Sequence, residues 1–471
     1  MNIAPRFVRA LARGLGSSRL ARAALSLVLS GSALVGGAGV AGASDEIAAG
    51  KPIFSSSLSG SATVHVATDL DQNIIVAGSF EGVLDLGGNT RLVSEDESDI
   101  FIAKLSSAGK LLWAERVGGA GTQHGMAVAT DLDGNIVVTG STRAPVVQGF
   151  PVPPSEIFAA KVDPTGRQLF TMSFGSMHSG IGLGAAVSEK GEITLVGRFS
   201  GIARFDDFAI KSAPDAPKGD AFVFRLAPNG RVLWGHALGG LGEQYAGSIA
   251  ATPGGGVVLS GLFSGTLEVD GKQHVSTGAP SAFVVAFNDA GIVRFSKNLG
   301  PSLGDIPRVV ADPTGDVLIA GTFRGRLDLD AGTLVSAGED DVFALKLDAY
   351  GEPVFLQGFG DEGSQQLGGA AIDAFGEVAL AMSSFGNVDL GAGSLEGHGG
   401  YDVALVKLDA LGAPLLGVTF GDHRDQFASD VVIDAAGNIV LAGQVAGSID
   451  FGDGALEATG GFDAFLTSLT P

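Results

Sequence analysis

The chain contains no cysteine and has few basic residues for its length of 471. Without thiols it cannot form disulfides, thiolate zinc sites or a cysteine nucleophile. Its 29 Lys and Arg residues against 51 Asp and Glu residues give a formal net charge of −22. Because an acidic surface repels nucleic acid and anionic lipid, we expect neither as a partner, whereas a cation or a basic partner stays possible.

Long helices are excluded by the glycine content, which is 74 residues. Gly costs about 1 kcal/mol at each site in a helix interior, so frequent Gly interrupts helices. These glycines follow no three-residue period, which excludes a collagen-like chain. Hydrophobic residues make up 45% of the sequence and charged residues 17%, so the chain can bury a large core and is not a disordered polymer.

The first 43 residues have the layout of a secretory signal peptide. Five arginines and no acidic residue precede an uncharged stretch, Ala23 to Val40, which leads to a small-x-small site at Ala41-Gly42-Ala43. We predict cleavage after Ala43 and an exported domain, residues 44–471, in the periplasm, at the cell surface or outside the cell. An uncleaved membrane anchor is the alternative. The stretch is short and weakly apolar for a span of about 20 residues, so we expect no membrane span after cleavage.

One unit of sequence repeats along the chain. A Lys-Leu pair that closes an apolar run marks it, and the second residue of the pair recurs at intervals of 57 to 64 residues, at Leu105, Val162, Leu226, Phe287, Leu347, Leu408 and Leu469. Within the clearest unit four β-like runs are separated by turn residues: Met126–Thr130, Ile136–Thr139, Ile157–Val162 and Gln168–Ser173. Seven copies indicate a repeat architecture.

The second run of each unit is apolar at consecutive positions, as in Ile136-Val137-Val138. A sheet with one face in water would alternate apolar and polar residues, so this sheet is covered on both faces. Four-stranded sheets that pack face to face around an axis meet this requirement. The sequence therefore predicts an all-β fold, a seven-bladed β-propeller of four-stranded antiparallel blades.

The two ends of the chain predict how the ring closes. A Gly opens the fourth strand of six units and an aromatic residue or Leu stands four positions later, as in Gly109 and Trp113. The seventh unit stops at Pro471 before its fourth strand, but Gly50 and Phe54 repeat the same spacing one period before Gly109. We predict that the N-terminal strand completes the last blade as its outermost strand, which leaves no half-blade with an open edge.

The repeat resembles that of bacterial β-propeller-repeat proteins of the SBBP type over about residues 50–471. The likeness is strongest at Gly118–Thr142, which reads Gly-Gly-x-Gly, then Asp-Gly-Asn and Ile-Val-Val-Thr-Gly, and at Asn73–Gly78 and Asn438–Gly443. Thr122-Gln123 stands where the family has an acidic pair, and Val137 where it commonly has Tyr. The resemblance implies an exported, surface-associated propeller and no defined activity.

Long segments join the second and third strands, and by up-and-down geometry they lie on the same face as the connections between blades. Loops on a rigid scaffold commonly carry binding, so we expect the ligand on this face. A short motif in these segments predicts a side hairpin and places an acidic residue at Asp85, Glu268, Asp328, Asp389 and Asp450. These residues could form an acidic ring for a cation or a basic partner; we favour Asx-type turns, in which Asp accepts backbone N–H bonds.

A glutamine follows the blade-closing glycine by five residues at Gln123, Gln244, Gln365 and Gln426. We place these amides near the mouth of the central channel, where a ring of them could bind a sugar or a peptide. The alternative that we favour is a bond to the backbone of the neighbouring blade, because buried polar groups need partners.

The segments Asp131-x-Asp133-Gly134-Asn135 and Asp69-x-Asp71-x-Asn73 resemble the start of a calcium loop. The bidentate Glu at the twelfth position is missing, since Thr142 stands there, so a hairpin turn is the better interpretation. We assign no cofactor and no catalytic residue, and calcium stays possible.

These observations favour a non-enzymatic, exported binding or interaction scaffold whose partner is an unknown protein or glycan. The competing class is a secreted glycan hydrolase or lyase with its site at the channel mouth. A third hypothesis is a calcium-stabilised structural surface protein.

Overall fold

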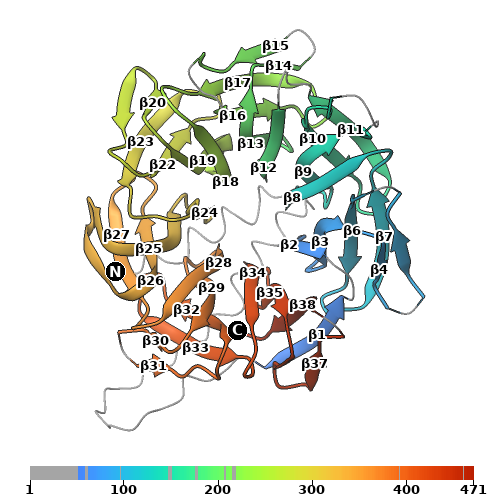
Figure 1. Cartoon of the computed structure of the whole chain (residues 1–471), viewed down its shortest axis with the longest axis vertical. Coiled ribbons are helices and arrows are strands. Elements are labelled where there is room, and N and C mark those ends of the chain that lie inside the picture. The colour runs from blue at the N-terminus through green and yellow to red at the C-terminus, as the bar shows by residue number, and fades with distance from the viewer. Residues whose placement is uncertain are drawn as a thin grey trace, which may run out of the picture. The chain divides into compact units, whose positions relative to one another are not determined.

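Each predicted blade is present as a four-stranded antiparallel sheet, and seven such sheets occur among the described residues (Figure 1). The computed structural model describes residues 51–471 except 59–61, 88, 96, 147–150, 175–178, 206–207, 215–218, 392 and 460. The predicted signal peptide, residues 1–43, lies outside the described residues. None of the described helices has the length and hydropathy of a membrane-crossing segment.

The strands follow one another in the order that the repeat predicts. The first three blades are β2 (Ala62–Thr68), β3 (Ile74–Phe80), β6 (Asp99–Leu105) and β7 (Leu111–Val117); β8 (Thr122–Thr130), β9 (Ile136–Arg143), β10 (Glu156–Val162) and β11 (Gln168–Phe174); and β12 (Ser179–Val187), β13 (Ile193–Ser200), β16 (Asp220–Leu226) and β17 (Val232–Leu238). The fourth and fifth are β18 (Gln244–Thr252), β19 (Gly256–Phe263), β22 (Ser281–Phe287) and β23 (Val293–Gly300); and β24 (Arg308–Ala311), β25 (Val317–Leu329), β26 (Gly332–Leu347) and β27 (Pro353–Phe359). The sixth and seventh are β28 (Ser364–Ile372), β29 (Val378–Phe385), β32 (Tyr401–Leu408) and β33 (Pro414–Phe420); and β34 (Gln426–Ile433), β35 (Ile439–Val445), β38 (Asp463–Leu469) and β1 (Pro52–Leu58).

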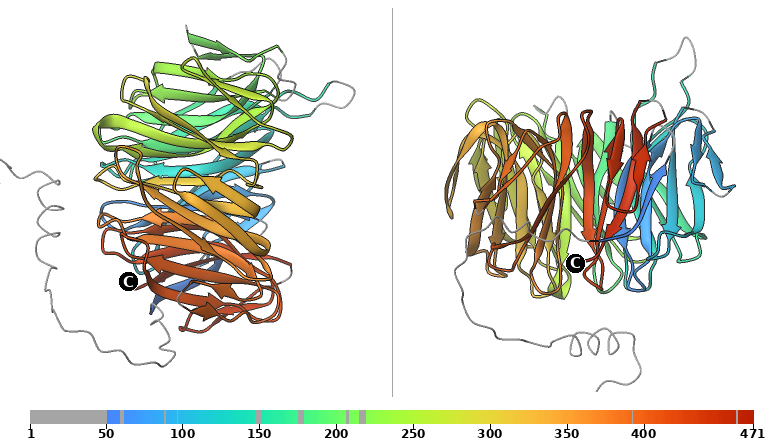
Figure 2. Two further views of the ribbon diagram at one scale, coloured as in Figure 1. Left: turned by 90° about the vertical axis from the view of Figure 1, so that its left-hand side faces the viewer. Right: turned by 90° about the horizontal axis from the view of Figure 1, so that it is seen from below.

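The first strand of each blade is innermost. These strands contact one another in sequence around the ring, and β2 contacts both β8 and β34, so the ring closes. In Figure 2 the blades are seen from the side, with their strands running between the two faces of the ring. One face, which we call the connection face, carries the ends of the second and fourth strands. The other, the turn face, carries the tight turns, one of which contains the short helix η1 (Pro253–Gly255).

The core lies between neighbouring blades. Ile75 and Ala77 of β3 pack with Ile136 and Val138 of β9 and with Phe158 of β10, all of them at most 4% exposed. Because the middle strands of each sheet are covered on both faces, their apolar residues stand at consecutive positions, as predicted.

The N-terminal strand completes the seventh blade as predicted. β1 pairs antiparallel with β38, with Ser55 opposite Thr467. The Ser55 and Thr467 hydroxyls lie 3.1 Å apart, and the Thr467 hydroxyl donates to the Phe54 carbonyl at 3.0 Å. The Thr470 N–H donates to the Lys51 carbonyl at 2.8 Å. β1 therefore forms the outer edge of this sheet and covers β38, which lies between β1 and β35.

The pairing of Gly with an aromatic residue in the fourth strand has a packing reason. A Cβ on Gly109, whose φ is +75°, would lie 2.4 Å from the ring of Phe54 in the preceding blade. Trp234 lies in the same way 2.8 Å from such a Cβ on Gly291, whose φ is +76°. At these two turns the aromatic ring of one blade occupies the space over the turn glycine of the next, where only Gly satisfies both the space and the left-handed backbone.

The predicted side hairpins form, but they do not stay on the connection face. They are β4 (Val83–Asp85) with β5 (Arg91–Val93), β14 (Ile202–Phe205) with β15 (Phe208–Lys211), β20 (Thr266–Val269) with β21 (Lys272–Val275), β30 (Val388–Asp389) with β31 (Ser394–Leu395) and β36 (Ser448–Asp450) with β37 (Ala455–Glu457). In the fifth blade, β25 and β26 continue into the hairpin. The hairpins contact fourth strands and lie at the outer rim in Figure 1.

Apolar contacts explain why the hairpins lie at the outer rim. Phe205 of β14 lies 3.9 Å from Phe174 of β11, measured between ring centroids, and Phe451 lies 4.8 Å from Phe420 of β33. Each hairpin thus covers apolar surface of an outer strand, and this burial draws it away from the face on which we expected it.

Candidate functional site

The four predicted glutamines point inward and are at most 3% exposed. The Gln365 amide donates to the Asn387 carbonyl at 3.0 Å, and its oxygen accepts from the Asp361 N–H at 3.2 Å. The Gln426 amide donates to the Ala446 carbonyl at 3.1 Å. Gln123 and Gln244 make corresponding bonds, to the Gly119 N–H and the Thr266 carbonyl.

Each glutamine stands at the start of a blade's first strand. Its bonds join the connection that leads into that blade from the preceding one to the segment that follows the second strand of the same blade. We expected a bond to the neighbouring blade; the partners lie instead in the glutamine's own blade and in the connection that leads into it. The buried amides therefore link the backbone segments of the connection face to one another and do not form an exposed ring.

A buried carboxylate that the sequence reasoning missed stands beside these amides. The third strand of five blades carries an Asp six residues before its last residue, at Asp99, Asp220, Asp341, Asp402 and Asp463, each at most 6% exposed. One oxygen accepts a backbone N–H from the preceding segment, for example that of Ala213 at 2.7 Å from Asp220 and that of Ala337 at 2.8 Å from Asp341. The signal was an Asp six residues before the Leu that marks the period.

The other oxygen of four of these carboxylates, those of Asp99, Asp220, Asp341 and Asp402, is buried and accepts no hydrogen bond from any described residue. Between the sixth and seventh blades, Asp402 Oδ1 and Gln426 Oε1 both lie within 2.4 Å of the point where a Cβ on Gly421 would stand. Two acceptors thus converge on one small buried space, and Gly is required between them because any side chain would collide with both.

Burial raises the pKa of the Asp402 carboxyl, an effect that nearby Asp422 reinforces and that the His398 N–H and imidazole oppose. Burial likewise raises the pKa of Asp220 and Asp341. A protonated carboxyl can donate a hydrogen bond to the glutamine oxygen beside it, whereas an ionised one leaves two acceptors facing each other.

We expect the substitution Asp402→Asn to flatten the pH dependence of stability. A carboxyl whose pKa is raised on folding contributes stability below its unfolded pKa of about 3.9 and loses it as pH rises through the folded pKa. The amide retains an acceptor for the His398 N–H and supplies a donor toward Gln426, so the variant should equal or exceed the wild type in free energy of unfolding at pH 7. Urea unfolding between pH 4 and pH 8 measures this.

The matched control is Asp85→Asn, because the Gly87 N–H and Arg91 lower the pKa of Asp85. That substitution should cost stability above the unfolded pKa and leave the decline toward high pH unchanged. If Asp402→Asn loses as much free energy of unfolding between pH 4 and pH 7 as the wild type does, the pH dependence does not come from the Asp402 carboxyl and its proton.

The acidic residues of the side hairpins are not brought together. Asp85, Asp389 and Asp450 each accept a backbone N–H two residues later, from Gly87, Gly391 and Gly452 at 3.0, 2.7 and 2.7 Å, which confirms the Asx turns. Asp328 differs, because its carboxylate binds the Arg326 guanidinium and the Thr333 hydroxyl. Glu268 lies in the side-hairpin strand β20 of the fourth blade, and Arg204 stands at the corresponding position of the side hairpin in the third blade. All lie on separate hairpins of the outer rim.

The Asp-rich turns on the turn face are hairpin turns. Asp131 Oδ1 accepts the N–H groups of Asp133 and Asn135 at 3.0 and 2.8 Å, and Oδ2 pairs with Lys161 Nζ at 3.0 Å. Asp69 pairs in the same way with Lys104 at 2.9 Å. Within the described residues, no group of three or more His, Asp or Glu is arranged to hold a metal ion.

The lysine of the repeat marker is therefore a buried cation. Lys104, Lys161, Lys346 and Lys407 are at most 7% exposed, and Arg225 is fully buried. The lysines pair with acids of their own blade's first hairpin, and Arg225 with Glu192 and with Asp289 of the next blade. The sequence reasoning used this residue only to measure the period.

The central channel contains a cavity of about 340 Å³ lined by first strands, including His65, Met126, Leu183, Arg308 and Leu367. Burial lowers the pKa of His65, and Arg308 lowers it further against the opposing effect of Asp430. Asp430 itself accepts the Val66 N–H at 3.1 Å. The channel thus holds the His65 imidazole near the Asp430 carboxylate, at 4.0 Å, and the Arg308 guanidinium.

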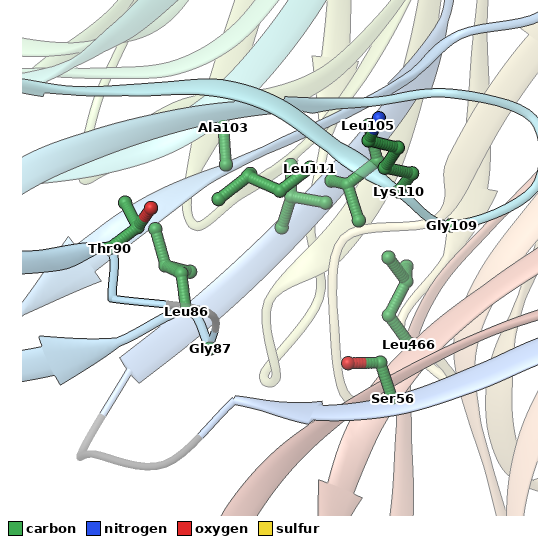
Figure 3. A pocket seen from close by; sticks show the side chains of 11 residues that line it. Ser56, Leu86, Gly87, Thr90, Ala103, Leu105, Gly109, Lys110, Leu111 and Leu466 are labelled. Atoms are coloured by element: carbon green, nitrogen blue, oxygen red, sulfur yellow. The ribbon is translucent and has the colours of Figure 1, made fainter.

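A second cavity, of about 380 Å³, lies at the seam where the ring closes (Figure 3). Ser56 and Leu466 of the seventh blade face Leu86 and Thr90 of a side hairpin and Leu111 of β7 across it. Its lining is largely apolar, so it is a gap in packing beside β1 with few groups that could orient a polar ligand.

No family model matches the chain. Among curated proteins, an uncharacterised WD repeat-containing protein of Acanthamoeba polyphaga mimivirus is 27% identical over 228 residues, which cover 40% of this chain and 16% of that protein. The chain therefore spans less than a fifth of the length of this relative.

Solved structures resemble the chain at low sequence identity. A protein of unknown function from Dyadobacter fermentans is 12% identical with a TM-score of 0.40, covering 74% of this chain and 95% of its own. YCF48 bound to a D1 peptide is 10% identical with a TM-score of 0.42, covering 89% and 95%. Puromycin hydrolase is 11% identical with a TM-score of 0.46, covering 83% and 51%. At these identities the likeness concerns the fold alone.

Proposed function

We propose that the chain is an exported binding scaffold of the SBBP type that engages a protein or a glycan through its connection face. One observation carries the proposal: the connections of this face are held by buried amides and carboxylates. Gln365 and Gln426 bind the segments on both sides of them, and Asp341 and Asp402 bind the segments before them. Loops fixed in this way lose little entropy on binding.

The seven-bladed fold and the similarity to a WD repeat-containing protein support a binding role. The turn face offers short turns with few residues to vary, whereas the connection face offers longer segments. Export rests on the signal-peptide layout of the first 43 residues. A secreted enzyme would need a constellation of acid, base and nucleophile on the same face.

The test is binding of residues 44–471 to a glycan array and a peptide array. We expect at least one component to bind, and the double variant Glu362→Lys/Arg424→Glu, which reverses two exposed charges on the connection face, to weaken it at least roughly tenfold. The matched turn-face variant Tyr350→Ser/Leu411→Ser, at residues 86% and 75% exposed, should leave binding unchanged. Loss of binding by the turn-face variant alone, or product formation from an array component, would overturn the proposal.

A further inference from the structure

Four aromatic side chains form a row across the sixth and seventh blades on the connection face. Phe385 ends β29, Tyr401 begins β32, Phe427 lies at the start of β34, and Phe462 directly precedes β38. Successive ring centroids are 5.7, 5.2 and 5.6 Å apart. Phe385 is 50% and Phe462 is 44% exposed, and the two rings between them are half-buried. We call these four residues the aromatic row.

The propeller repeat does not require these rings. Tyr401 and Phe462 directly precede the buried Asp of their third strands, and the same position holds Ser98, Gly219 and Asp340 in other blades.

Phe385 likewise has no aromatic counterpart in the repeat. It pairs with Tyr401 one position beyond the pair Ser384 and Asp402. By the same alignment, its counterparts are Glu81 after β3, Ser200 of β13, Ser264 after β19, and Arg324 of β25. Phe427 has one aromatic counterpart, Tyr245 of the fourth blade, whereas the positions of Phe385, Tyr401 and Phe462 hold small or polar residues in the other blades compared above. Four partly exposed aromatic rings that gather in this way mark a binding surface.

The backbone beneath the aromatic row is fixed. The Tyr401 N–H donates to Asp425 Oδ1 at 3.1 Å. A Cβ on Gly400 would lie 2.1 Å from the Arg424 carbonyl oxygen, and one on Gly399 would lie 2.9 Å from the Cα of His423. The segment that carries Tyr401 is therefore packed directly against the segment that leads to Phe427, and the rings need little ordering when a ligand binds.

The rim of the row mixes donors and acceptors. His398 and His423 have side chains 47% and 81% exposed, and Arg424 and Asp425 stand beside Phe427 in sequence. Asp422 and Asp425 flank His423 and Arg424 in this segment, so the edge carries acceptors and donors together. Groups of both kinds suit hydroxyls, which donate and accept at once.

Ring faces carry the negative part of the aromatic quadrupole and attract C–H groups polarised by a neighbouring oxygen. A sugar ring offers such C–H groups on its flat face and hydroxyls around its edge. We propose that the aromatic row binds an uncharged oligosaccharide, whose sugar rings stack on Tyr401, Phe427 and their neighbours while the rim binds its hydroxyls. The inference rests on the proposed function, because it names the ligand class of the connection face.

The experiment is titration calorimetry of residues 44–471 with cellohexaose, chitohexaose and maltohexaose as separate probes. We expect at least one probe to bind, Tyr401→Ser to weaken that binding roughly tenfold, and Phe462→Ser to weaken it roughly threefold. Ser98 stands at the equivalent position of the first blade, so serine is compatible with the fold, and thermal melts check this. Tyr350→Ser, on the turn face and 86% exposed in the wild type, is the control that should change nothing.

The oligosaccharide site is overturned if none of the three probes binds, or if Tyr401→Ser binds them as tightly as the wild type does. It is also overturned if the row instead binds a second copy of the chain or a proline-rich peptide, and Tyr401→Ser abolishes that binding. In the last case the proposed function stands and only the ligand class is wrong. A ligand found on the arrays whose binding depends on Glu362 but not on Tyr401 would likewise overturn the oligosaccharide site, since it would bind elsewhere on the connection face.

Discussion

A chain that begins at Ala62, and so lacks β1, should melt roughly 10 °C or more below a chain that begins at Ser44. The loss removes the whole ladder between β1 and β38, including the pair Ser55 and Thr467. It also exposes the unpaired edge of β38, and such an edge pairs with other chains. We therefore expect the shorter chain to self-associate as well, which light scattering during the melt would record.

Adding the missing strand as a separate peptide tests whether the lower melting temperature comes from the open ring or from a general loss of stability. A synthetic peptide of residues 50–58 should restore part of the melting temperature of the shorter chain, because an extended peptide can complete an open sheet edge. A peptide with the same composition in scrambled order is the control. Equal melting temperatures for the two chains would show that the seventh blade is stable with three strands.

The substitution Arg225→Met should cost about 3 to 5 kcal/mol of the free energy of unfolding. The guanidinium is fully buried and donates to Glu192 at 2.9 Å, to the Thr194 hydroxyl at 2.9 Å and to the Gly255 carbonyl at 2.9 Å. Its removal leaves these acceptors without a donor and separates the third blade from the first turn of the fourth. Urea unfolding measures the difference, provided that the free energy of unfolding depends on urea concentration with the same slope in the variant and the wild type.

The control is Arg167→Met, which removes an ion pair of similar length on the surface. Arg167 lies 2.9 Å from Asp163, but its side chain is 75% exposed, so the loss should be within about 1 kcal/mol. The fourth blade carries Ala286 where the third carries Arg225, so an apolar residue is compatible with the strand itself. An Arg225→Met variant as stable as Arg167→Met would mean that water replaces the lost donor.

The sequence predicts the ring well because its signals repeat. Glycine, the apolar second strand and the strand-four aromatic each recur at one spacing, and Phe54 and Gly109 confirm that spacing by direct contact across the seam. Even the strand donated by the N-terminus follows from the missing piece of the last unit. Local pattern and global fold agree at these positions, so periodicity alone suffices.

The polar interior could not be predicted in the same way. Lys161 and Arg225 belong to residue types that are rarely buried, and only the hairpin turn shows that Asp131 lies within 3.0 Å of Lys161. Asp402 and Gln426 are separated by a strand and a turn, so spacing gives no sign that their oxygens converge over Gly421. For the glutamines the sequence favours amides bonded to the neighbouring blade, whereas Gln365 and Gln426 bind segments of their own blade and of the connection that leads into it.

The aromatic row shows the same limit at the surface. Phe385, Tyr401, Phe427 and Phe462 stand in four different elements or segments, each isolated among small and polar residues. The repeat hides them, since a comparison of units emphasises what the units share. Their proximity arises from the packing of two blades, and what distinguishes the site is a departure from the period.

The shared seventh blade also bears on how the chain reaches its final form. Ser55 and its partner Thr467 are 412 residues apart in sequence, so β1 is synthesised before every other strand of the ring and is the last of them to pair. Blades one to six can form from neighbouring segments, but the final pairing must wait until β38 has been synthesised. Contacts of such high sequence separation form slowly, so ring closure should be the rate-limiting step of maturation. During that wait, the molecule carries a free N-terminal strand and an unpaired β38.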